Sequence, residues 1–274
     1  MSEVINVDNF MQQSKKDCHT ATIAVREELA PNIISIWIEA PVIAAEAVSG
    51  QFVNLYLRNA AKLLPRPISI CETDKDYGRV RLVFRVLSPR AGTAEIARLG
   101  VGDSIDVIGP LGNGYQLTNK SAMLIGGGIG IPPMLQLSKD LSNMFGKKPK
   151  IVLGYQNSNL FLSEDLLPYG DLFISTDDGS AGVKGTVMDV INGLDLDADV
   201  IYACGPLPML RAVKELALAR DIPAYLSLEA RMGCGIGACL GCVCETTHID
   251  EHSKVNNARV CVEGPVFEAR EVEI

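Results

Sequence analysis

Residues 122–134 read AMLIGGGIGIPPM: an apolar run leads into a glycine-rich turn, and two prolines then begin the next segment. Glycines let a pyrophosphate approach the backbone N–H groups, and the dipole of a helix that starts at Pro132 favours the bound anion. The spacing fits G-x-G-x-G-x-x-P, because the third glycine position of the standard dinucleotide fingerprint falls on Ile131 here. A nucleotide-phosphate loop is therefore predicted, with an ordinary strand-to-helix turn as the alternative. The glycines of the loop are Gly126, Gly127, Gly128 and Gly130.

The sequence around this loop alternates apolar strand runs with amphipathic helical runs over residues 118–226. That alternation predicts a nucleotide-binding α/β domain, a parallel sheet with helices on both faces. A later strand ends in ACGP, at the sheet edge where open parallel sheets bind their ligands. Cys204 and the glycine loop are therefore expected to face one crevice, although a lone cysteine is more often buried and inert. After another strand, Asp177 or Asp178 either binds ribose hydroxyls or belongs to an ordinary turn.

Residues 15–117 read as short strands rich in β-branched residues and separated by turn signals. A small antiparallel barrel is the natural closure for such strands. The strand in LLPRPISI carries Arg66 and Ser69 beside two prolines, which suggest a sheet edge or a bulge. Arginine offers a fork for a diphosphate and serine a hydroxyl for a flavin ring, while a plain surface arginine is the alternative. A short helix is expected in GTAEIARLG (92–100), with Thr93 as its cap.

The tail, residues 227–274, holds five of the eight cysteines within 28 residues. Cys234, Cys239 and Cys242 have the spacing C-x4-C-x2-C, and Cys261 follows after 18 residues. Plant-type [2Fe–2S] sites have this arrangement, whereas structural zinc sites usually pair two short cysteine knuckles. The tail is therefore predicted to be a small cluster domain that iron orders in place of a hydrophobic core. Zinc and unligated thiols are the alternatives.

Two other features of the tail have plainer explanations. Cys244 lies two places after a predicted ligand on an extended segment, so its side chain is expected to point away from the cluster and to pack as a thiol. It is also the substitute if one ligand is wrongly assigned. His248 and His252 would suit a histidine-ligated cluster, but four cysteines are already available and a solvated loop is the better interpretation.

The net charge, the lengths of the apolar runs and the opening residues argue against several classes of function. Asp and Glu total 33 against 25 Lys and Arg, and this net charge of −8 argues against a nucleic-acid partner. No run reaches the roughly 18 apolar residues of a membrane helix. The opening MSEVINVDNF lacks the pattern of a secretory signal, so a cytoplasmic location is expected. Clustered thiols in a reducing compartment more often bind metal than form disulfides.

Three motifs follow one another along the chain: RPIS in the predicted barrel, then GGGIGIPP, then CGP. In this the chain resembles the ferredoxin–NADP reductase-like flavoproteins. The C-x4-C-x2-C…C tail narrows the resemblance to the electron-transfer subunits of the NAD-dependent, type B dihydroorotate dehydrogenases. The resemblance spans the chain from about Cys18 to Ile274, and it rests on PRPISI, GPLGNGY, GGGIGIPPM, CGPLPML and NNARVCVEGPVF. The implied architecture is an antiparallel FAD-binding β-barrel, a parallel-sheet nucleotide-binding domain and a small [2Fe–2S] domain.

The resemblance also implies which residues hold each group. FAD is expected on three segments of the barrel: Arg66, Pro67, Ile68 and Ser69; Val83, Phe84 and Arg85; Gly92 and Thr93. NAD is expected on the glycine loop, from which it reaches toward Cys204, Gly205 and Pro206. The segment VLSPRA, between Arg85 and Gly92, lacks the glycine that the family leads one to expect, which leaves the local backbone path open.

The chemistry of these groups suggests an order of electron flow. NAD accepts a hydride, a cluster passes single electrons and a flavin does both, so the expected order is cluster, FAD, NAD. The sequence shows no Ser/His/Asp set or carboxylate pair, so substrate oxidation is expected on another chain. By resemblance that chain is an FMN-containing catalytic subunit of pyrimidine biosynthesis, in a heterotetramer of two of each chain. The alternatives are a reductase subunit serving a hydrogenase, a sulfite reductase or ferredoxin, and a non-catalytic zinc-stabilised binding module.

Overall fold

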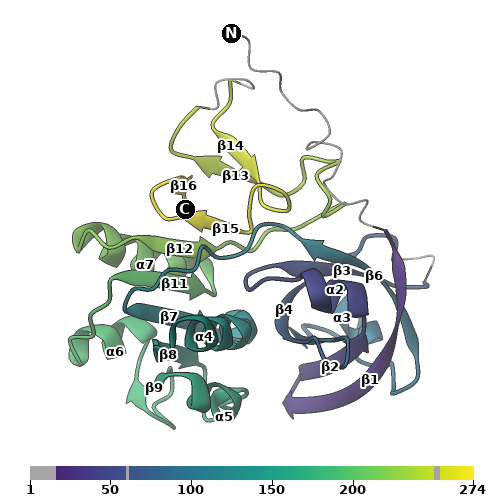
Figure 1. Cartoon of the computed structure of the whole chain (residues 1–274), viewed down its shortest axis with the longest axis horizontal. Coiled ribbons are helices and arrows are strands. Elements are labelled where there is room, and N and C mark those ends of the chain that lie inside the picture. The colour runs from purple at the N-terminus through teal and green to yellow at the C-terminus, as the bar shows by residue number, and fades with distance from the viewer. Residues whose placement is uncertain (1–16, 60–61, 250–253) are drawn as a thin grey trace.

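The amino-terminal third of the chain forms a closed antiparallel barrel with the strand order β1-β2-β5-β4-β3-β6 (Figure 1). The computed structural model describes residues 17–59, 62–249 and 254–274. The amino-terminal ten residues, residues 15 and 16 of the predicted barrel domain, and His252 lie outside this description. The barrel strands are β1 (His19–Ala30), β2 (Ile33–Glu39), β3 (Phe52–Tyr56), β4 (Arg66–Asp74), β5 (Arg79–Arg85) and β6 (Ser104–Leu111).

Alternating apolar side chains close these strands into a barrel because each strand turns one face inward. Ile23 of β1, Ile36 of β2 and Leu82 of β5 are fully buried in a single apolar cluster. The short helix α2 (Pro41–Glu46) adds Ile43 and Ala44 to the same cluster. The predicted antiparallel barrel is thereby confirmed, with its core inside the barrel.

Strand β4 is paired on only one side where the RPIS segment begins. Arg66 and Ser69 pair with β3, whereas pairing with β5 starts at Ile70 and shifts register before Glu72. Proline has no N–H to donate to a neighbouring strand, so Pro67 fits a stretch that is free on one side. The prediction of an edge or a bulge at the prolines is confirmed, inside a barrel that is closed elsewhere.

The predicted cap of the short helix is wrong. Helix α3 (Gly92–Ile96) has Ala91 at its N-cap and no side-chain cap, so Thr93 lies inside its first turn. The preceding turn, in which the Ala91 N–H donates to the Ser88 carbonyl at 3.0 Å, brings the chain into the helix two residues earlier than a Thr93 cap implies. Thr93 is thereby free to face the cleft described below.

Residues from Ala122 onward form a mostly parallel sheet with the order β10-β9-β8-β7-β11-β12-β15. The glycine loop leaves β7 and enters helix α4 at Pro132, as predicted. Cys204 ends β11, which is the direct neighbour of β7. The parallel strands are β7 (Ala122–Gly127), β8 (Lys150–Tyr155), β9 (Asp171–Thr176), β10 (Val183–Lys184), β11 (Val200–Cys204) and β12 (Ala224–Ser227).

Helices cover both faces of this sheet, which confirms the doubly covered α/β architecture (Figure 1). One face packs against α4 (Pro132–Phe145) and α5 (Ser163–Leu166), and the other against α6 (Val187–Gly193) and α7 (Leu207–Ala219). Both faces need such a cover because buried apolar residues along each strand point alternately to the two sides of the sheet. Among the described residues, no helix has both the length and the apolar content to cross a membrane.

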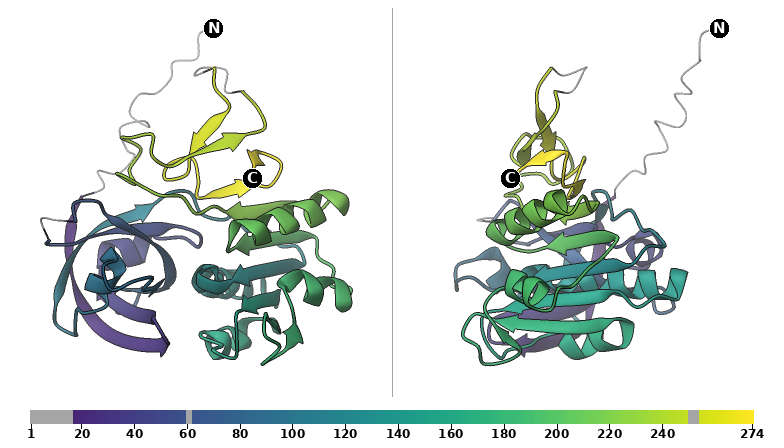
Figure 2. Two further views of the ribbon diagram at one scale, coloured as in Figure 1. Left: turned by 180° about the vertical axis from the view of Figure 1, so that it is seen from behind. Right: turned by 90° about the vertical axis from the view of Figure 1, so that its left-hand side faces the viewer.

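The tail is joined to the sheet more closely than expected. Its strand β15 (Val266–Glu268) pairs antiparallel with β12, and β14 (Asn257–Arg259), β13 (Val243–Thr246) and β16 (Val272–Glu273) form a separate small sheet. The tail lies across the top of the barrel and the large sheet (Figure 2). Cys242, Val260 and Phe267 are buried in the core cluster that also holds the α7 side of the sheet. The expectation of iron in place of a hydrophobic core is therefore corrected, because the tail shares the core of its neighbour.

Candidate functional site

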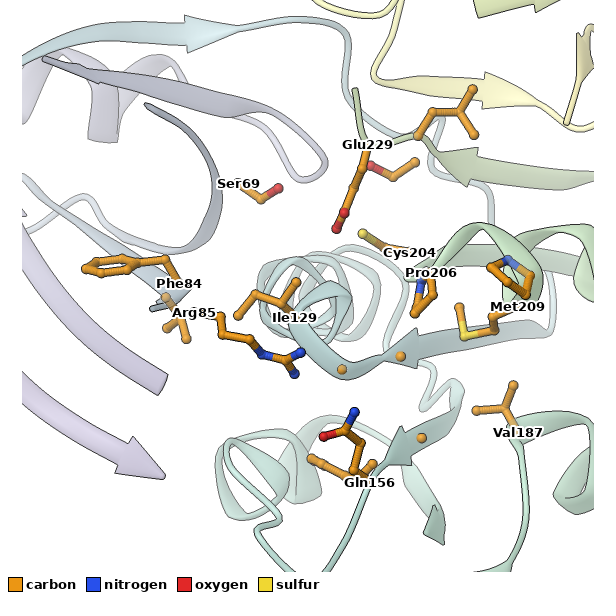
Figure 3. A pocket seen from close by; sticks show the side chains of 18 of the residues that line it. Ser69, Phe84, Arg85, Ile129, Gln156, Val187, Cys204, Pro206, Met209 and Glu229 are labelled. Atoms are coloured by element: carbon orange, nitrogen blue, oxygen red, sulfur yellow. The ribbon is translucent and has the colours of Figure 1, made fainter. Parts of the chain in front are cut away.

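A cleft of about 780 Å³ opens between the barrel and the large sheet (Figure 3). This volume is within the range of cofactor sites, which are mostly apolar with a few placed polar groups. Its walls come from all three parts of the chain, because Ala230 and Pro265 of the tail also contribute. Eleven of the predicted cofactor residues line it: Pro67, Ile68, Ser69, Val83, Phe84, Arg85, Thr93, Gly127, Gly128, Cys204 and Pro206.

On the barrel side, Arg66 and Gly92 are tied to each other rather than to the cleft surface. The Arg66 guanidinium donates to the Leu64 and Pro65 carbonyls at 2.5 and 3.2 Å. A Cβ at Gly92 would stand only 1.7 Å from Arg66 Nε, so the guanidinium occupies the space that a side chain there would need. The glycine is required by this close approach, and the arginine fork stays near the helix that carries Thr93.

On the sheet side, the glycine loop packs on the neighbouring strand end. A Cβ at Gly130 would lie 2.3 Å from the Cys204 carbonyl oxygen, and one at Gly127 would lie 2.5 Å from the Met209 sulfur. Gly128 has a φ of +53°, and a Cβ there would come within 3.5 Å of an Arg85 guanidinium nitrogen. The structure thus brings the predicted glycine loop next to the CGP segment on one side and to Arg85 of the barrel on the other. Gly126, Gly130 and Gly205 support this arrangement from behind the cleft surface.

Cys204 and Glu229 point into the same part of the cleft (Figure 3). Burial raises the pKa of the Cys204 thiol to about 12, and the nearby Glu229 carboxylate adds to this rise. Such a thiol stays protonated at neutral pH and is no nucleophile. Glu229 is an exposed residue, yet desolvation of its carboxyl raises its pKa, and Arg85 offsets part of the rise. Glu229 was missed from sequence, although an acidic residue directly after an apolar strand at this sheet edge was a signal for it.

Ser175 is a second cleft residue that the sequence analysis missed. It is the last residue but one of β9 and pairs with Gly154, and its hydroxyl oxygen is buried with no hydrogen-bond partner in the described part of the chain. Buried hydroxyls are normally satisfied, so this one is suited to a bound molecule in the cleft. Asp177 also lines the cleft, whereas Asp178 accepts hydrogen bonds from the N–H and hydroxyl of Ser180 in a local turn.

In the loop that runs from Cys234 to Cys242, the cysteine loop, backbone N–H groups surround the sulfur of Cys234. The Cys239 N–H donates to Cys234 Sγ at 3.3 Å. Although burial raises it, the pKa of the Cys234 thiol falls to about 7 because the N–H groups of Ile236, Cys239 and Ala238 favour the thiolate. Gly235 and Gly237 have φ values of +67° and +84°, so glycine is what allows the loop to curl around the sulfur.

The other two predicted ligands form a second pair. Cys242 and Cys261 are both buried, and their side chains are close enough to hydrogen bond. Within the described residues, no three metal-binding side chains are grouped as ligands of a single ion. Cys234 is thus next to Cys239 and Cys261 next to Cys242, and Cys261 is also near enough to Cys234 to be affected by its charge. In a binuclear cluster each iron takes two thiolates, and these two neighbouring pairs suit that arrangement.

The remaining tail residues agree with the plainer interpretations. Cys244 is half-buried and packs against the core of the large sheet, as expected for a packed thiol. His248 is exposed, in agreement with a solvated loop. All eight cysteines are free thiols.

Two family models match the chain. Residues 21–115 match the oxidoreductase FAD-binding domain. Residues 229–273 match the iron–sulfur cluster binding domain of dihydroorotate dehydrogenase B. The chain therefore carries a flavin-binding domain and an iron–sulfur domain on either side of the nucleotide sheet.

Solved structures share the fold of most of the chain. A chain of the NADH-dependent reduced ferredoxin–NADP oxidoreductase is 30% identical, with a TM-score of 0.82 over 92% of this chain and 89% of that chain. A flavohemoglobin from Malassezia yamatoensis, 18% identical, has a TM-score of 0.64 over 80% of this chain and 61% of its own length. The second similarity shows the fold alone, which is that of the ferredoxin–NADP reductase-like proteins.

Relatives of known name extend over nearly the whole length. The dihydroorotate dehydrogenase B (NAD(+)) electron transfer subunit of Geobacillus kaustophilus is 41% identical over 257 residues, covering 92% of this chain and 96% of that protein. Its counterpart in Streptococcus pneumoniae is 41% identical over 254 residues, covering 90% and 95%. With both cofactor domains matched as well, the chain belongs to the family of dihydroorotate dehydrogenase B electron transfer subunits.

Proposed function

We propose that this chain passes electrons from a dihydroorotate-oxidising partner, through an iron–sulfur cluster and FAD, to NAD+ in pyrimidine biosynthesis. One observation carries the proposal: a single cleft joins barrel residues expected to hold a flavin with sheet residues expected to hold a nicotinamide. Direct transfer needs the two reacting rings held next to each other, and this cleft has walls for both. The names of the relatives supply the donor and the acceptor.

The barrel wall fits FAD and the sheet wall fits NAD. Ser69 and Thr93, which both carry hydroxyls, line the cleft, and the Arg66 guanidinium lies beside Gly92 at the start of α3. The bare backbone of the glycine loop receives the NAD diphosphate, while Cys204 and Glu229 border the space where the two rings meet. When bound, FAD exchanges a hydride with NAD and single electrons with the cluster. Burial raises the pKa of the Cys204 thiol to about 12, so this neighbour of the rings stays a neutral thiol, and burial raises the pKa of the Glu229 carboxyl while Arg85 lowers it.

For the cluster, the ligands are Cys234 with Cys239 and Cys242 with Cys261. The backbone donors around Cys234 Sγ favour the thiolate that iron requires. The pairwise grouping of sulfurs supports a [2Fe–2S] centre. Thiolate ligation also requires reducing conditions, which supports a cytoplasmic location.

The partner is an FMN-containing catalytic subunit, and the assembly has two copies of each chain. A direct test mixes this chain with that partner, dihydroorotate and NAD+, and follows NADH at its absorbance band. NADH formation that needs both chains is expected. Failure with an active partner, together with rapid electron exchange with ferredoxin, would favour a ferredoxin-linked reductase, the activity named for the 30% identical structure.

An exposed apolar rim around the cysteines supports docking of the partner at the cluster. Leu240 is 77% exposed between two predicted ligands, and Ile236 and Val262 are also exposed beside them. A Leu240→Arg change is expected to weaken binding of the partner at least about tenfold, because interface anchors contribute of the order of 2 kcal/mol. Surface plasmon resonance measures this. Leu167→Arg, at an exposed leucine remote from the tail, is the matched control and leaves the affinity unchanged. Equal affinities for both variants would contradict docking at this rim.

Ser175 provides a test of the nucleotide wall. Its hydroxyl has no partner in the described chain, so a Ser175→Ala change costs the fold little but removes one hydrogen bond to NAD. The KM for NADH is expected to rise about 3- to 10-fold with kcat nearly unchanged, the effect of losing one net hydrogen bond of about 1 kcal/mol. Steady-state reduction of ferricyanide by NADH measures both constants. An unchanged KM would show that Ser175 does not contact the nucleotide.

A further inference from the structure

Asn54 is a buried polar residue of the barrel whose side chain reaches the cysteine loop. It stands on β3 with no exposed surface. Its Nδ2 donates a hydrogen bond of 3.0 Å to the backbone carbonyl of Cys234, 180 residues away in sequence. Burying an amide costs more free energy than burying an apolar side chain of the same shape. Packing of the barrel alone would therefore favour an apolar residue here. The Asn54 side chain also affects the nearby Tyr56 hydroxyl on the same strand, but the bond to Cys234 is the one that links the barrel to the tail.

The cysteine loop rests directly on this amide. Gly235 has a φ of +67°, and a Cβ there would lie 2.3 Å from Asn54 Nδ2. No side chain therefore separates the loop backbone from the barrel strand. The other end of the amide, Oδ1, is buried without a hydrogen-bond partner among the residues that the structure describes. A buried, unsatisfied oxygen costs free energy, and the hydrogen bond from Nδ2 to the Cys234 carbonyl offsets part of that cost.

Strand β3 also reaches the cleft, so it links the two proposed cofactor sites. Phe52 lines the cleft and pairs with Ser69, while Asn54 pairs with Pro67 on the same neighbouring strand. Phe52 and Asn54 are two residues apart, so their side chains leave the strand on the same face. The cysteine loop and the RPIS segment are thus both held by one short piece of backbone.

We propose that Asn54 is a positioning residue for electron transfer: its amide fixes the Cys234 loop relative to the flavin wall formed by β3 and β4. This inference rests on the proposed function. The rate of single-electron transfer falls steeply with the distance between the two groups. Loss of the Asn54 donor therefore slows exchange between the cluster and the flavin, while exchange between NAD and the flavin, which uses the opposite wall of the cleft, is preserved.

The test uses the full-length, cofactor-loaded Asn54→Asp variant, which keeps the shape of the side chain but sets an acceptor against the Cys234 carbonyl. In stopped-flow reduction by NADH, the flavin band is expected to bleach within about twofold of the wild-type rate. The later bleaching of the cluster band is expected to slow at least about tenfold, as small misplacements do. The electron paramagnetic resonance signal of the dithionite-reduced cluster is expected to broaden, because the loop is no longer fixed. FAD and iron contents stay at the wild-type values.

Asn113→Asp is the matched control. Its Nδ2 also donates to tail carbonyls, those of Val262 and Glu263 at 3.1 and 2.9 Å, but at an exposed site where water replaces the donor. Its cluster-band rate is expected to stay within about twofold of wild type. Equal slowing in the Asn54 and Asn113 variants, or an unchanged rate in Asn54→Asp, overturns the inference.

A second variant covers the case in which Asn54→Asp does not fold. Asn54→Ser keeps a polar group that is too short to reach the Cys234 carbonyl, and the same selective slowing is expected. If both variants lose FAD, Asn54 is a residue for barrel folding and the inference is wrong. A wild-type protein without iron contradicts the proposed function itself, whereas loaded variants with wild-type rates contradict this inference alone.

Discussion

A Cys261→Ser protein is expected to lose its iron while it keeps FAD. Cys261 is only 2% exposed and is paired with Cys242, so its replacement leaves one iron with a single thiolate. The cleft contains neither cysteine, and the barrel core is separate from the core that holds them. Iron and sulfide analysis should fall to background, and transfer from dihydroorotate to NAD+ with the partner should be lost. Reduction of the bound flavin by NADH should persist.

Cys244→Ser is the matched control for this experiment. Cys244 is a half-buried thiol in the same tail, but it is packed against the core of the large sheet and is not among the proposed ligands. Its replacement is expected to retain iron and transfer activity at wild-type values. Full iron content in Cys261→Ser, or loss of iron only in Cys244→Ser, would refute the ligand assignment and exchange the two roles.

The second large effect is expected at Gly130→Ala. The added Cβ would lie 2.3–2.5 Å from the backbone atoms of Cys204 and Gly205, so one of two adjacent strand ends must move. Forcing atoms into a packed region costs about 1–3 kcal/mol of stability. A displaced glycine loop also misplaces the nicotinamide, so NADH reduction of the bound flavin should slow by about 100-fold. Stopped-flow bleaching of the flavin band measures the rate, and thermal denaturation measures the stability.

Gly193→Ala is the corresponding control, because a Cβ at the end of α6 meets nothing within 4 Å. The same substitution there should leave flavin reduction unchanged and slightly raise the melting temperature, since alanine restricts the unfolded chain. A Gly130→Ala protein that matches this control in rate and stability would show that the glycine loop and the CGP segment do not pack as described.

Much of the fold could be predicted from sequence because the decisive signals are local. Alternation over a few residues marks each barrel strand, and the glycine turn with Pro132 marks a strand-to-helix junction. Strand β15 could not be found in this way. It has only three residues, Val266–Glu268, and its strand character depends on pairing with β12, about forty residues earlier. The prediction that Thr93 caps the helix was wrong for a related reason, because the turn before Gly92 decides where the helix begins.

The site residues also differ in whether a local sequence pattern could identify them. The glycine loop and Cys204 were correctly predicted to face one cleft because parallel strands end at one sheet edge. Ser175 and Asn54 carry no sequence signal, since a serine or an asparagine in a strand is remarkable only once it is known to be buried. The shared core of the tail was missed because Gly and Cys dominate its composition. Its few apolar residues, such as Val260 and Phe267, become significant only against the large sheet.

The central claim, that one chain carries both a flavin and an iron–sulfur cluster, is tested most directly by the visible spectrum of the purified protein with flavin, iron and sulfide analysis on the same sample. The account predicts a yellow-brown protein with about one FAD, two iron and two sulfide per chain, whose flavin and cluster bands both bleach on addition of NADH. A colourless protein that contains about one zinc ion per chain and no flavin would contradict the account.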